Sequence, residues 1–491
     1  MMLSRIAKAV ETVYQLGDRN PAVRGLSEDS RTVRKGDLFF AIPGAKVDGA
    51  SFARSALKRG AAALVVQDRP LEGVSAPQLV VPDIRRALAS AAHSYFGHPS
   101  RRLSVIGVTG TKGKTTTTYL IRSLLESAGR PAGLLGTVAY ETGKRRVEAP
   151  NTTPSSLTVA SLLAEMVRNR RKACVMEVSS HALEMDRVRG VEFRAAVFTN
   201  LTREHLDYHH TFAAYFDAKR RLFTEFPSVR VRVVNADDPW GAKLLAQLGR
   251  KAVGYGLKSR CAYRAKDVRV EAHRLSFTVD GHAFEAPLSG HFNVTNALAA
   301  VTVLRELGLS WTALSEGLRK APPPPGRFER VEAGQPFTVL VDYAHSPAAL
   351  EEALKAARKL AGKKGRVLSV FGCGGDRDRT KRPIMGRLSA SLADLSFLTS
   401  DNPRTEDPKA ILREVLGGIP KGLLRNGSRR VWVEADRAEA LRSCLQKAQE
   451  GDVVLVAGKG HETYQIIGDR KVHFDDRETV KRLLKKVGRA S

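Results

Sequence analysis

Two kinds of apolar segment alternate along the chain, short β-branched runs and longer amphipathic runs. The clearest example begins at residues 105–108, a β-branched run that enters a glycine-rich turn. An amphipathic segment follows the turn, with apolar side chains at 119–121 and 124–125. This order predicts a strand, a loop and a helix. Because the same alternation continues from 101 to about 325, we expect a mostly parallel sheet there.

The first 100 residues form a separate predicted unit. Residues 36–42 and 63–66 are typical of strands, and residues 50–60 are typical of a helix between them. An alanine-rich helix over 83–96 ends near Gly97-His98-Pro99, which we interpret as the first domain boundary. The predicted first domain is therefore a small α/β unit over 1–100.

A proline-rich segment at 322–326 indicates the second boundary. Beyond it, four apolar strands are each followed by a polar or glycine-rich turn, with helical segments between them; these strands are 337–342, 366–371, 395–400 and 452–457. That pattern predicts a Rossmann-like domain. The predicted fold class is α/β with three domains: 1–100, a central P-loop parallel-sheet domain over 101–325, and 326–491.

Composition is that of a globular protein, but the charge is unusual. The chain has 491 residues, of which 43% are hydrophobic and 27% charged, and its formal net charge is +29. Such a charge suits nucleic acid, an anionic surface or an anionic substrate. The basic residues are scattered and aromatic residues make up only 6%, so no base-stacking surface accompanies them. We therefore expect an anionic substrate and no nucleic acid.

Other bulk features give simpler expectations. The four cysteines are far apart in sequence and predict neither a metal site nor a disulfide framework. Residues 1–17 hold no long apolar run, and no later stretch is apolar enough to span a bilayer. We expect a cytoplasmic protein without membrane insertion, acting as a monomer.

The turn after the first central strand carries the sharpest chemical signal. Its backbone N–H groups and the following helix N-terminus are suited to holding phosphate oxygens. Lys114 would bridge the outer phosphates, and the Thr115 hydroxyl would face Mg²⁺. The general P-loop pattern requires glycine at 108, where this chain has Val108, so only a variant pattern is met. The residues predicted to hold the nucleotide here are Gly110, Thr111, Lys112, Gly113, Lys114, Thr115 and Thr116. The alternative is a glycine-rich turn with a solvated lysine.

Two further polar residues follow strands of the same predicted sheet. Glu177 ends the apolar run 173–177, and His205 follows the run 195–200. Ligands of open α/β sheets lie at the carboxyl ends of strands. Thr115, Glu177 and His205 are therefore predicted to hold Mg²⁺. Taken singly, Glu177 is better explained as a capping carboxylate and His205 as a structural histidine; their shared placement instead favours the metal.

Charged residues also gather at strand ends of the last domain. Arg377, Arg404 and Glu462 follow three of its four strands. Two guanidinium groups bind carboxylates, and a carboxylate binds an ammonium group. This set predicts a zwitterionic, carboxylate-rich amino acid as ligand.

Together, the motifs resemble those of the Mur ligase family, the amide ligases of peptidoglycan precursors, over nearly the whole chain. The matching segments are 109–116, 151–154, 177–181, 199–209, 290–300, 325–327, 342–345 and 458–462. Residues 401–404 and the order of the motifs resemble the family members that add the third amino acid.

The resemblance implies an ATP-dependent, ADP-forming acid–amino-acid ligase. ATP would phosphorylate the D-glutamate carboxylate of UDP-N-acetylmuramoyl-L-alanyl-D-glutamate, and the amine of meso-diaminopimelate would attack the acyl phosphate. The family position of Lys219 is carbamylated, which implies a catalytic role for it beside Lys114 and His205. Nucleotide contacts are implied for Asn293, Arg327 and Asp342.

The resemblance also implies the residues that contact the two other substrates. Those implied for the nucleotide-linked dipeptide are Ser30, Asn151, Thr152, Thr153, Ser179 and Arg187. Those implied for the amino acid are Arg377, Asp401, Asn402, Pro403, Arg404, Gly458 and Glu462.

Three alternatives stay open at this point. The first is the lysine-adding relative of the same family. The second is a folylpolyglutamate synthetase, against which the complete first domain and residues 401–404 argue. The third is a basic nucleic-acid-binding ATPase, which would need ATP turnover stimulated by nucleic acid.

Overall fold

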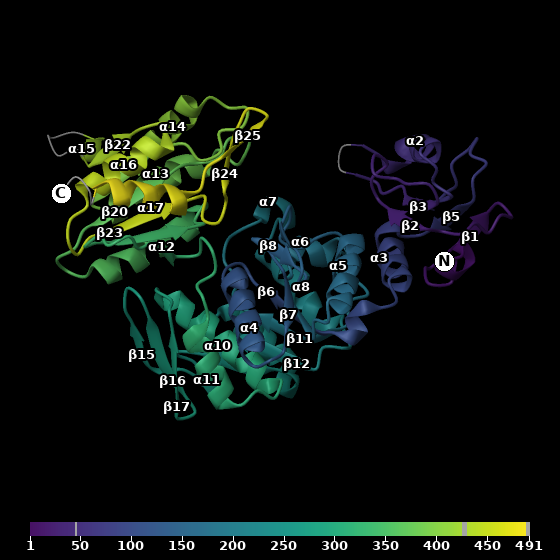
Figure 1. Cartoon of the computed structure of the whole chain (residues 1–491), viewed down its shortest axis with the longest axis horizontal. Coiled ribbons are helices and arrows are strands. Elements are labelled where there is room, and N and C mark those ends of the chain that lie inside the picture. Colours follow the sequence, from purple (N-terminus) through teal and green to yellow (C-terminus); the bar gives the residue numbers. More distant parts are fainter. Residues whose placement is uncertain (45–46, 425–429, 488–491) are drawn as a thin grey trace. The chain divides into compact units, whose positions relative to one another are not determined.

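The α/β class predicted from the sequence is confirmed in the computed structural model, which describes residues 1–44, 47–424 and 430–487 (Figure 1). Contacts divide the chain into two units, Met1–Arg264 with Ala299–Leu314, and Ala265–Leu298 with Ser315–Ser491. Each unit is described by itself. The predicted three-domain division stays a prediction.

The first 100 residues fold around a five-stranded sheet of order β1-β5-β4-β3-β2. Adjacent strands in this sheet are parallel, except for β1 and β5, which are antiparallel to each other. Its strands are β1 (Tyr14–Leu16), β2 (Gly25–Ser27), β3 (Asp37–Phe40), β4 (Ala63–Gln67) and β5 (Gln78–Val81). Its helices are α1 (Leu3–Ala7), η1 (Gly49–Phe52), α2 (Ala53–Lys58), α3 (Ile84–Tyr95) and η2 (Pro99–Arg102).

Two helices of this part were predicted from the sequence. The Asp83 carboxylate caps α3 by accepting hydrogen bonds from the N–H groups of Arg85 and Arg86. The helix predicted over 50–60 instead begins as the 3₁₀ turn η1, which the Asp48 side chain caps, and becomes α-helical only in α2.

The central sheet of the first unit has nine strands, in the order β14-β13-β12-β11-β6-β10-β7-β8-β9. It is parallel from β14 to β7 and antiparallel from β7 to β9. The strands are β6 (Ser104–Thr109), β7 (Ala132–Leu135), β8 (Ala139–Glu141), β9 (Arg146–Glu148), β10 (Ala173–Glu177), β11 (Phe193–Phe198), β12 (Val231–Asn235), β13 (Val253–Gly256) and β14 (Tyr263–Arg264).

Helices connect the strands of this sheet, as expected for parallel neighbours. They are α4 (Lys114–Ser127), α5 (Ser156–Arg168), α6 (Ser180–Glu184), α7 (Leu206–His209), α8 (Phe212–Thr224), α9 (Pro239–Leu248) and η3 (Gly249–Lys251). The helices α10 (His291–Glu306) and α11 (Trp311–Lys320) come later in the chain. Because β10, β6 and β11 are neighbours, the segments that follow them start at one edge of the sheet.

The second unit holds a six-stranded sheet of order β18-β19-β23-β20-β21-β22, parallel except for β18. The strands are β18 (Glu329–Arg330), β19 (Thr338–Asp342), β20 (Val367–Phe371), β21 (Leu395–Leu398), β22 (Val431–Val433) and β23 (Val453–Ala457). The helices are α12 (Pro347–Ala361), α13 (Lys381–Leu392), α14 (Pro408–Leu416), α15 (Lys421–Leu424), α16 (Arg437–Lys447) and α17 (Asp476–Val487).

Both faces of this sheet are covered. Along β23, Val453 and Leu455 belong to the apolar cluster that includes α12 and α13, whereas Val454 and Val456 belong to the cluster that includes α16 and α17. A strand buried on both faces appears as a continuous apolar run, which is why residues 452–457 were predicted correctly.

An antiparallel three-stranded sheet in the second unit was not predicted. It consists of β15 (Lys266–Val270), β16 (Leu275–Val279) and β17 (His282–Ala286). The sequence signal was the alternation of apolar and hydroxyl residues from Leu275 to Val279, which the structure shows as alternating buried and half-buried positions, since one face of such a sheet is solvated. A two-stranded hairpin, β24 (Tyr464–Ile467) with β25 (Arg470–His473), completes the unit.

Among the residues that the structure describes, every helix is too short or too polar to cross a lipid bilayer.

The buried side chain of His93, on α3, makes the stability of the fold depend on pH. Its side chain is buried, and neither ring nitrogen has a hydrogen-bond partner among the described residues. Burial, with a smaller contribution from His98, lowers the pKa of His93 from 6.5 to about 4. The folded chain therefore keeps this ring neutral at pH values where the unfolded chain protonates it.

We expect His93→Leu to flatten the acid dependence of stability. In the parent chain the unfolded state binds the extra proton, so stability falls as pH drops from about 6.5 to about 4, by up to about 3 kcal/mol. Thermal unfolding midpoints of both chains across this range measure the effect. An equally steep dependence in His93→Leu would contradict it.

Candidate functional site

The predicted phosphate loop joins β6 to α4 and is built around two glycines. Gly113 has φ +81° and precedes the first helical residue, Lys114. Gly110 has φ +151°, and a Cβ there would lie 1.9 Å from the Thr199 hydroxyl oxygen. Any side chain at Gly110 would displace the segment after β11. The loop therefore needs glycine for both its backbone shape and its close packing.

The segment after β11 fixes this loop through several hydrogen bonds. Thr111 N donates to the Asn200 carbonyl at 2.9 Å, and Lys112 N donates to Asn200 Oδ1 at 3.0 Å. The Thr199 hydroxyl donates to the Lys112 carbonyl at 2.6 Å. Because these bonds hold the loop in place, its geometry is preorganised.

Two lysine ammonium groups meet at this loop. Lys114 Nζ donates to the Gly110 carbonyl at 2.9 Å, and Lys219 Nζ donates to the same oxygen at 2.8 Å. Lys219 is fully buried on α8, and burial together with the nearby Lys114 charge lowers its pKa well below the ordinary value. A lowered pKa increases the share of the neutral, nucleophilic amine.

Glu177 ends β10 and faces the loop. Its carboxylate is buried and accepts hydrogen bonds from the hydroxyls of Thr115 at 3.1 Å and Thr137 at 3.0 Å, and from Thr137 N at 2.8 Å. A carboxylate beside a threonine hydroxyl at a phosphate loop fits Mg²⁺, which takes few protein ligands and completes its shell with water and phosphate oxygens. No cluster of three or more His, Cys, Asp or Glu side chains suited to a metal occurs in the described part of the chain.

His205, the third predicted metal ligand, precedes α7 with φ +56°. Among the described residues it makes no hydrogen bond with Thr115 or Glu177; its ring contacts His181, with centroids 5.0 Å apart. Partial burial lowers its pKa, and the charges of Lys114 and Lys219 act in the same direction. A neutral imidazole is the form that binds a metal.

Residues predicted to contact the nucleotide-linked dipeptide lie partly in one network. The Thr153 hydroxyl donates to the Glu177 carbonyl at 2.8 Å and accepts from Ser179 N at 3.0 Å. Arg187 donates to the Thr153 carbonyl at 3.1 Å, and Thr152 contacts the Thr137 hydroxyl at 3.1 Å. This network connects the segment 152–153 directly to the residues beside the loop.

Two other predicted contacts lie outside that network. Asn151 is exposed, and its carbonyl accepts a hydrogen bond from the Tyr140 hydroxyl. Ser30 is buried in the turn between β2 and β3.

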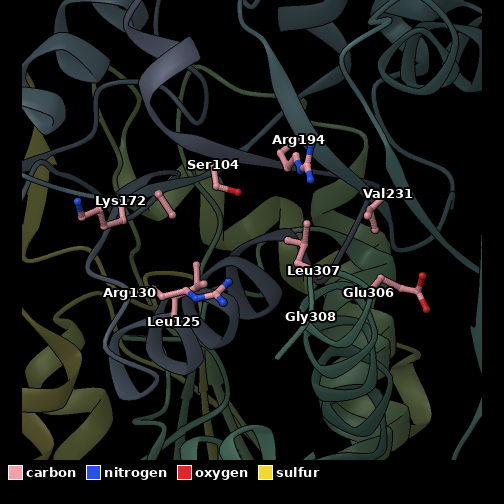
Figure 2. A pocket seen from close by; sticks show the side chains of 10 residues that line it. Ser104, Leu125, Arg130, Lys172, Arg194, Val231, Glu306, Leu307 and Gly308 are labelled. Carbon is pink, nitrogen blue, oxygen red and sulfur yellow. The ribbon is translucent and has the colours of Figure 1, made fainter. Parts of the chain in front are cut away.

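A cavity of about 420 Å³ lies at the amino ends of the central strands, opposite the carboxyl ends that carry the predicted site (Figure 2). Ser104, Ala173 and Val231, the first residues of β6, β10 and β12, line it. None of the predicted site residues contributes to its wall. It is therefore separate from the phosphate loop, which follows the carboxyl end of β6.

In the second unit, two of the three predicted nucleotide contacts, Arg327 and Asp342, lie at the end of β19. Burial raises the pKa of Asp342 to about 6, against the opposing effect of the Arg327 charge. Arg327 stacks on the Tyr343 ring at 4.7 Å, and its buried Nε has no hydrogen-bond partner among the described residues. A buried donor without a partner fits a site that a ligand completes. Asn293 is buried in the first turn of α10, and its Nδ2 donates to the Ser289 carbonyl at 2.7 Å.

The predicted amino-acid residues also gather at strand ends. Arg377 and Arg404 both approach Gly374, since a Cβ there would lie 3.7 Å from Arg377 Cγ and 3.0 Å from Arg404 Nη1. Arg404 Nη1 also donates to the Gly375 carbonyl at 2.7 Å. Pro403, which precedes Arg404 in the chain, is buried. The arrangement places the Arg404 guanidinium group and the stem of Arg377 near one glycine.

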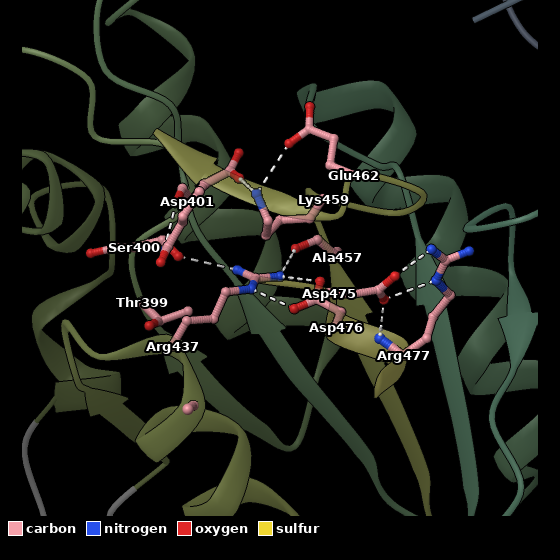
Figure 3. A network of polar contacts seen from close by, with 12 residues as sticks. Thr399, Ser400, Asp401, Arg437, Ala457, Lys459, Glu462, Asp475, Asp476 and Arg477 are labelled. Atoms are coloured by element: carbon pink, nitrogen blue, oxygen red, sulfur yellow. Dashed lines mark hydrogen bonds and ion pairs between the residues drawn. The ribbon is translucent and has the colours of Figure 1, made fainter. Parts of the chain in front are cut away.

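A second polar group, which includes Asp401, Lys459 and Glu462, lies on the loops that follow β21 and β23 (Figure 3). Asn402 Nδ2 donates to Glu462 Oε2 at 2.8 Å, and the buried Lys459 ammonium contacts the same oxygen at 3.1 Å. Asp401 lies 3.6 Å from Lys459 Nζ. Burial and the Asp401 charge raise the pKa of Glu462. Gly458, with φ +112°, lets this loop pass close to Asp401.

Sequence reasoning missed several residues of these sites. Lys459 stands inside a predicted motif, but its burial had no sequence signal. Thr137, the second hydroxyl on Glu177, follows the short strand β7 in an unremarkable stretch. Arg437 and Asp476 each begin a helix, where charged residues are usually solvated, yet both are fully buried.

The chain is similar to known proteins over nearly its full length. Family models match at three places: the Mur ligase catalytic domain at 22–96, the Mur ligase middle domain at 108–304 and the Mur ligase glutamate ligase domain at 326–460. Among curated relatives, the UDP-N-acetylmuramoyl-L-alanyl-D-glutamate–2,6-diaminopimelate ligase of Geobacter sulfurreducens is 45% identical, with 97% of each chain covered. The same-named protein of Gloeobacter violaceus is 46% identical, with 94% of each chain covered.

Solved structures are similar over the same length. A structure of UDP-N-acetylmuramoyl-L-alanyl-D-glutamate–2,6-diaminopimelate ligase is 34% identical, covers 95% of each chain and has a TM-score of 0.68. MurF from Acinetobacter baumannii, 21% identical with 98% of each chain covered and a TM-score of 0.67, shares the fold. On the family models and on relatives this similar over nearly their full length, the chain belongs to the Mur ligase family.

Proposed function

We propose that the chain is an ATP-dependent amide ligase that adds meso-diaminopimelate to UDP-N-acetylmuramoyl-L-alanyl-D-glutamate, releasing ADP and phosphate in peptidoglycan precursor synthesis. The observation that carries the proposal is the convergence of two arginine side chains near Gly374: Arg404, whose Nη1 would lie 3.0 Å from a Cβ there, and Arg377, whose Cγ would lie 3.7 Å from it. Family membership and the names of the full-length relatives support it. Such a reaction on a nucleotide-linked precursor fits the expected cytoplasmic location.

The first chemical step activates the acid. The D-glutamate side-chain carboxylate attacks the γ-phosphorus of ATP, ADP leaves, and an acyl phosphate forms. The catalytic task is to position the two anions and to offset their charge. The N–H groups at the start of α4 and the Lys114 ammonium would do this, because both offer positive charge to phosphate oxygens.

We further propose that Mg²⁺ binds at Thr115 and Glu177, with His205 as a third ligand. When bound, the ion would neutralise charge on the transferring phosphoryl group. The hydroxyl and carboxylate are already in contact. Thr137 orients the carboxylate from the other side through two hydrogen bonds.

Lys219 is the residue we propose to be carbamylated. Its buried amine has a strongly lowered pKa and can attack CO₂; the nitrogen forms a bond to carbon, one proton leaves, and an anionic carbamate results. The modification would replace a buried cation beside Lys114 by an anion, and so remove a like-charge contact.

The second chemical step joins the amine. An amine of diaminopimelate attacks the acyl carbon, loses a proton, and expels phosphate. Glu462 would hold an ammonium group, and Arg404 a carboxylate, of the amino acid. Lysine lacks that carboxylate, so its binding would leave the guanidinium desolvated and unpaired, at a cost of about 3 kcal/mol.

Amino-acid competition tests this assignment. With ATP and the nucleotide-linked dipeptide present, we expect phosphate release to need diaminopimelate, with little release when lysine replaces it. Release driven equally by lysine would instead support the lysine-adding relative.

Arg404→Ala should lower kcat/KM for diaminopimelate about tenfold to hundredfold, because a charge-assisted contact is lost, and leave KM for ATP unchanged. Arg413→Ala, at an exposed arginine of α14, is the matched control.

Lys114→Ala should reduce kcat by about a hundredfold or more without lowering the thermal midpoint. The ammonium stabilises charge that develops on the phosphates, whereas the loop stays attached through Asn200. Lys144→Ala, at an exposed turn, controls for loss of one positive charge. Substantial residual turnover in Lys114→Ala would contradict the role of the loop.

Carbamylation of Lys219 can be observed without an activity assay. In ¹³CO₂-saturated buffer we expect one carbamate carbon signal by NMR that Lys219→Arg abolishes, because guanidinium does not react. Lys243→Arg, on the exposed side of α9, should retain the signal. An unchanged spectrum in Lys219→Arg would disprove the modification at this residue.

A further inference from the structure

A fully buried ion pair lies beneath the amino-acid loops of the second unit. Arg437 begins α16 and Asp476 begins α17, and neither side chain is exposed. Arg437 Nε donates to Asp476 Oδ1 at 2.7 Å, and its Nη2 donates to Oδ2 at 2.8 Å (Figure 3). This bidentate geometry fixes the plane of the guanidinium group.

The same guanidinium group also binds two backbone carbonyls. Nη2 donates to the Ala457 carbonyl at 3.0 Å, and Nη1 donates to the Ser400 carbonyl at 3.3 Å. Ala457 ends β23, and Ser400 follows β21. Because β20 lies between these two strands, no ladder hydrogen bond can join them. Arg437 therefore connects two loop starts that the sheet itself does not.

Each of these carbonyls immediately precedes a predicted substrate residue. Asp401 follows Ser400, and Gly458 follows Ala457. Further along, Asn402 and Glu462 are hydrogen bonded to each other at 2.8 Å, and Lys459 contacts both. The relative position of the two loops thus sets the position of the polar atoms that would receive the amino acid.

Nearby carboxylates keep the buried guanidinium group of Arg437 charged. Burial disfavours the charge of Arg437, but the attraction of Asp476, with contributions from Asp401 and Glu462, raises its pKa overall. The guanidinium charge thus also acts on the carboxylates of both loops.

We propose that Arg437, oriented by Asp476, is a positioning residue for the amino-acid site, holding the Asp401–Arg404 and Gly458–Glu462 loops in register. The inference rests on the proposed function, since it concerns the same site. Lysine cannot replace arginine here, because an ammonium group is a point charge without the planar fork that spans a carboxylate and two carbonyls.

The test compares two Arg→Lys variants that differ in which end of the sheet they affect. Arg366 and Asp452 also form a bidentate pair, with Arg366 Nη2 2.6 Å from Asp452 Oδ2. They immediately precede β20 and β23, so this pair joins the amino ends of the strands. Arg366→Lys is therefore a matched control for loss of a bidentate pair in the same sheet.

We expect Arg437→Lys to raise KM for diaminopimelate about tenfold or more, with KM for ATP unchanged, because displaced loops misplace the binding groups. Arg366→Lys should lower the thermal midpoint but leave KM for diaminopimelate at the parent value. Equal KM values for diaminopimelate in the two variants would overturn the proposal.

A second variant covers the case in which Arg437→Lys does not fold. Arg437→Met with Asp476→Leu removes both charges and keeps apolar volume, which a buried pair often tolerates. The same rise in KM for diaminopimelate is expected, since the carbonyl contacts are lost; a parent KM in this folded variant would again overturn the proposal. Failure of the proposed function is distinct, because the parent chain itself would then show no diaminopimelate-dependent phosphate release.

Discussion

The carbonyl oxygen of Gly110 accepts hydrogen bonds from two lysines, and the chemistry of the first unit depends on this contact. Two ammonium groups on one oxygen repel each other, and Lys219 is also buried. Bound phosphate would offset the charge of Lys114, and a carbamate would reverse the charge of Lys219. The site is therefore organised for anions, and its polarity follows from backbone geometry that only glycine at 110 permits.

The second unit uses buried charge differently. Arg437, Asp476 and Lys459 are all fully buried, and each is paired. A buried pair seldom adds net stability over apolar residues of similar volume, because desolvation offsets its attraction. The role that we propose for the Arg437–Asp476 pair is geometric, because the planar guanidinium group holds the Ser400 and Ala457 carbonyls, where two loops begin. Arg404, which is half-buried and which we propose to bind the amino acid, can then be held by few contacts of its own.

Much of the architecture could be predicted from the sequence. Strands buried on both faces, such as β6, β10 and β23, appear as continuous apolar runs, and α3 carries its own capping residue, Asp83. The antiparallel strands β15–β17 were missed because short alternating segments carry a weaker signal. The start of α2 as a 3₁₀ turn was missed because local hydrogen bonding at Asp48 decides it.

The sequence by itself determined the phosphate loop, the polar residues at strand ends and the order of the motifs, since these depend on local spacing. Only the tertiary structure decided which side chains are buried and what they contact. Three hydrogen bonds join residues that are far apart in the chain: Thr137 to Glu177, Lys219 to Gly110, and Arg437 to Ser400. Such contacts follow from strand order, which local patterns do not encode, because pairing between distant strands depends on how the whole sheet packs.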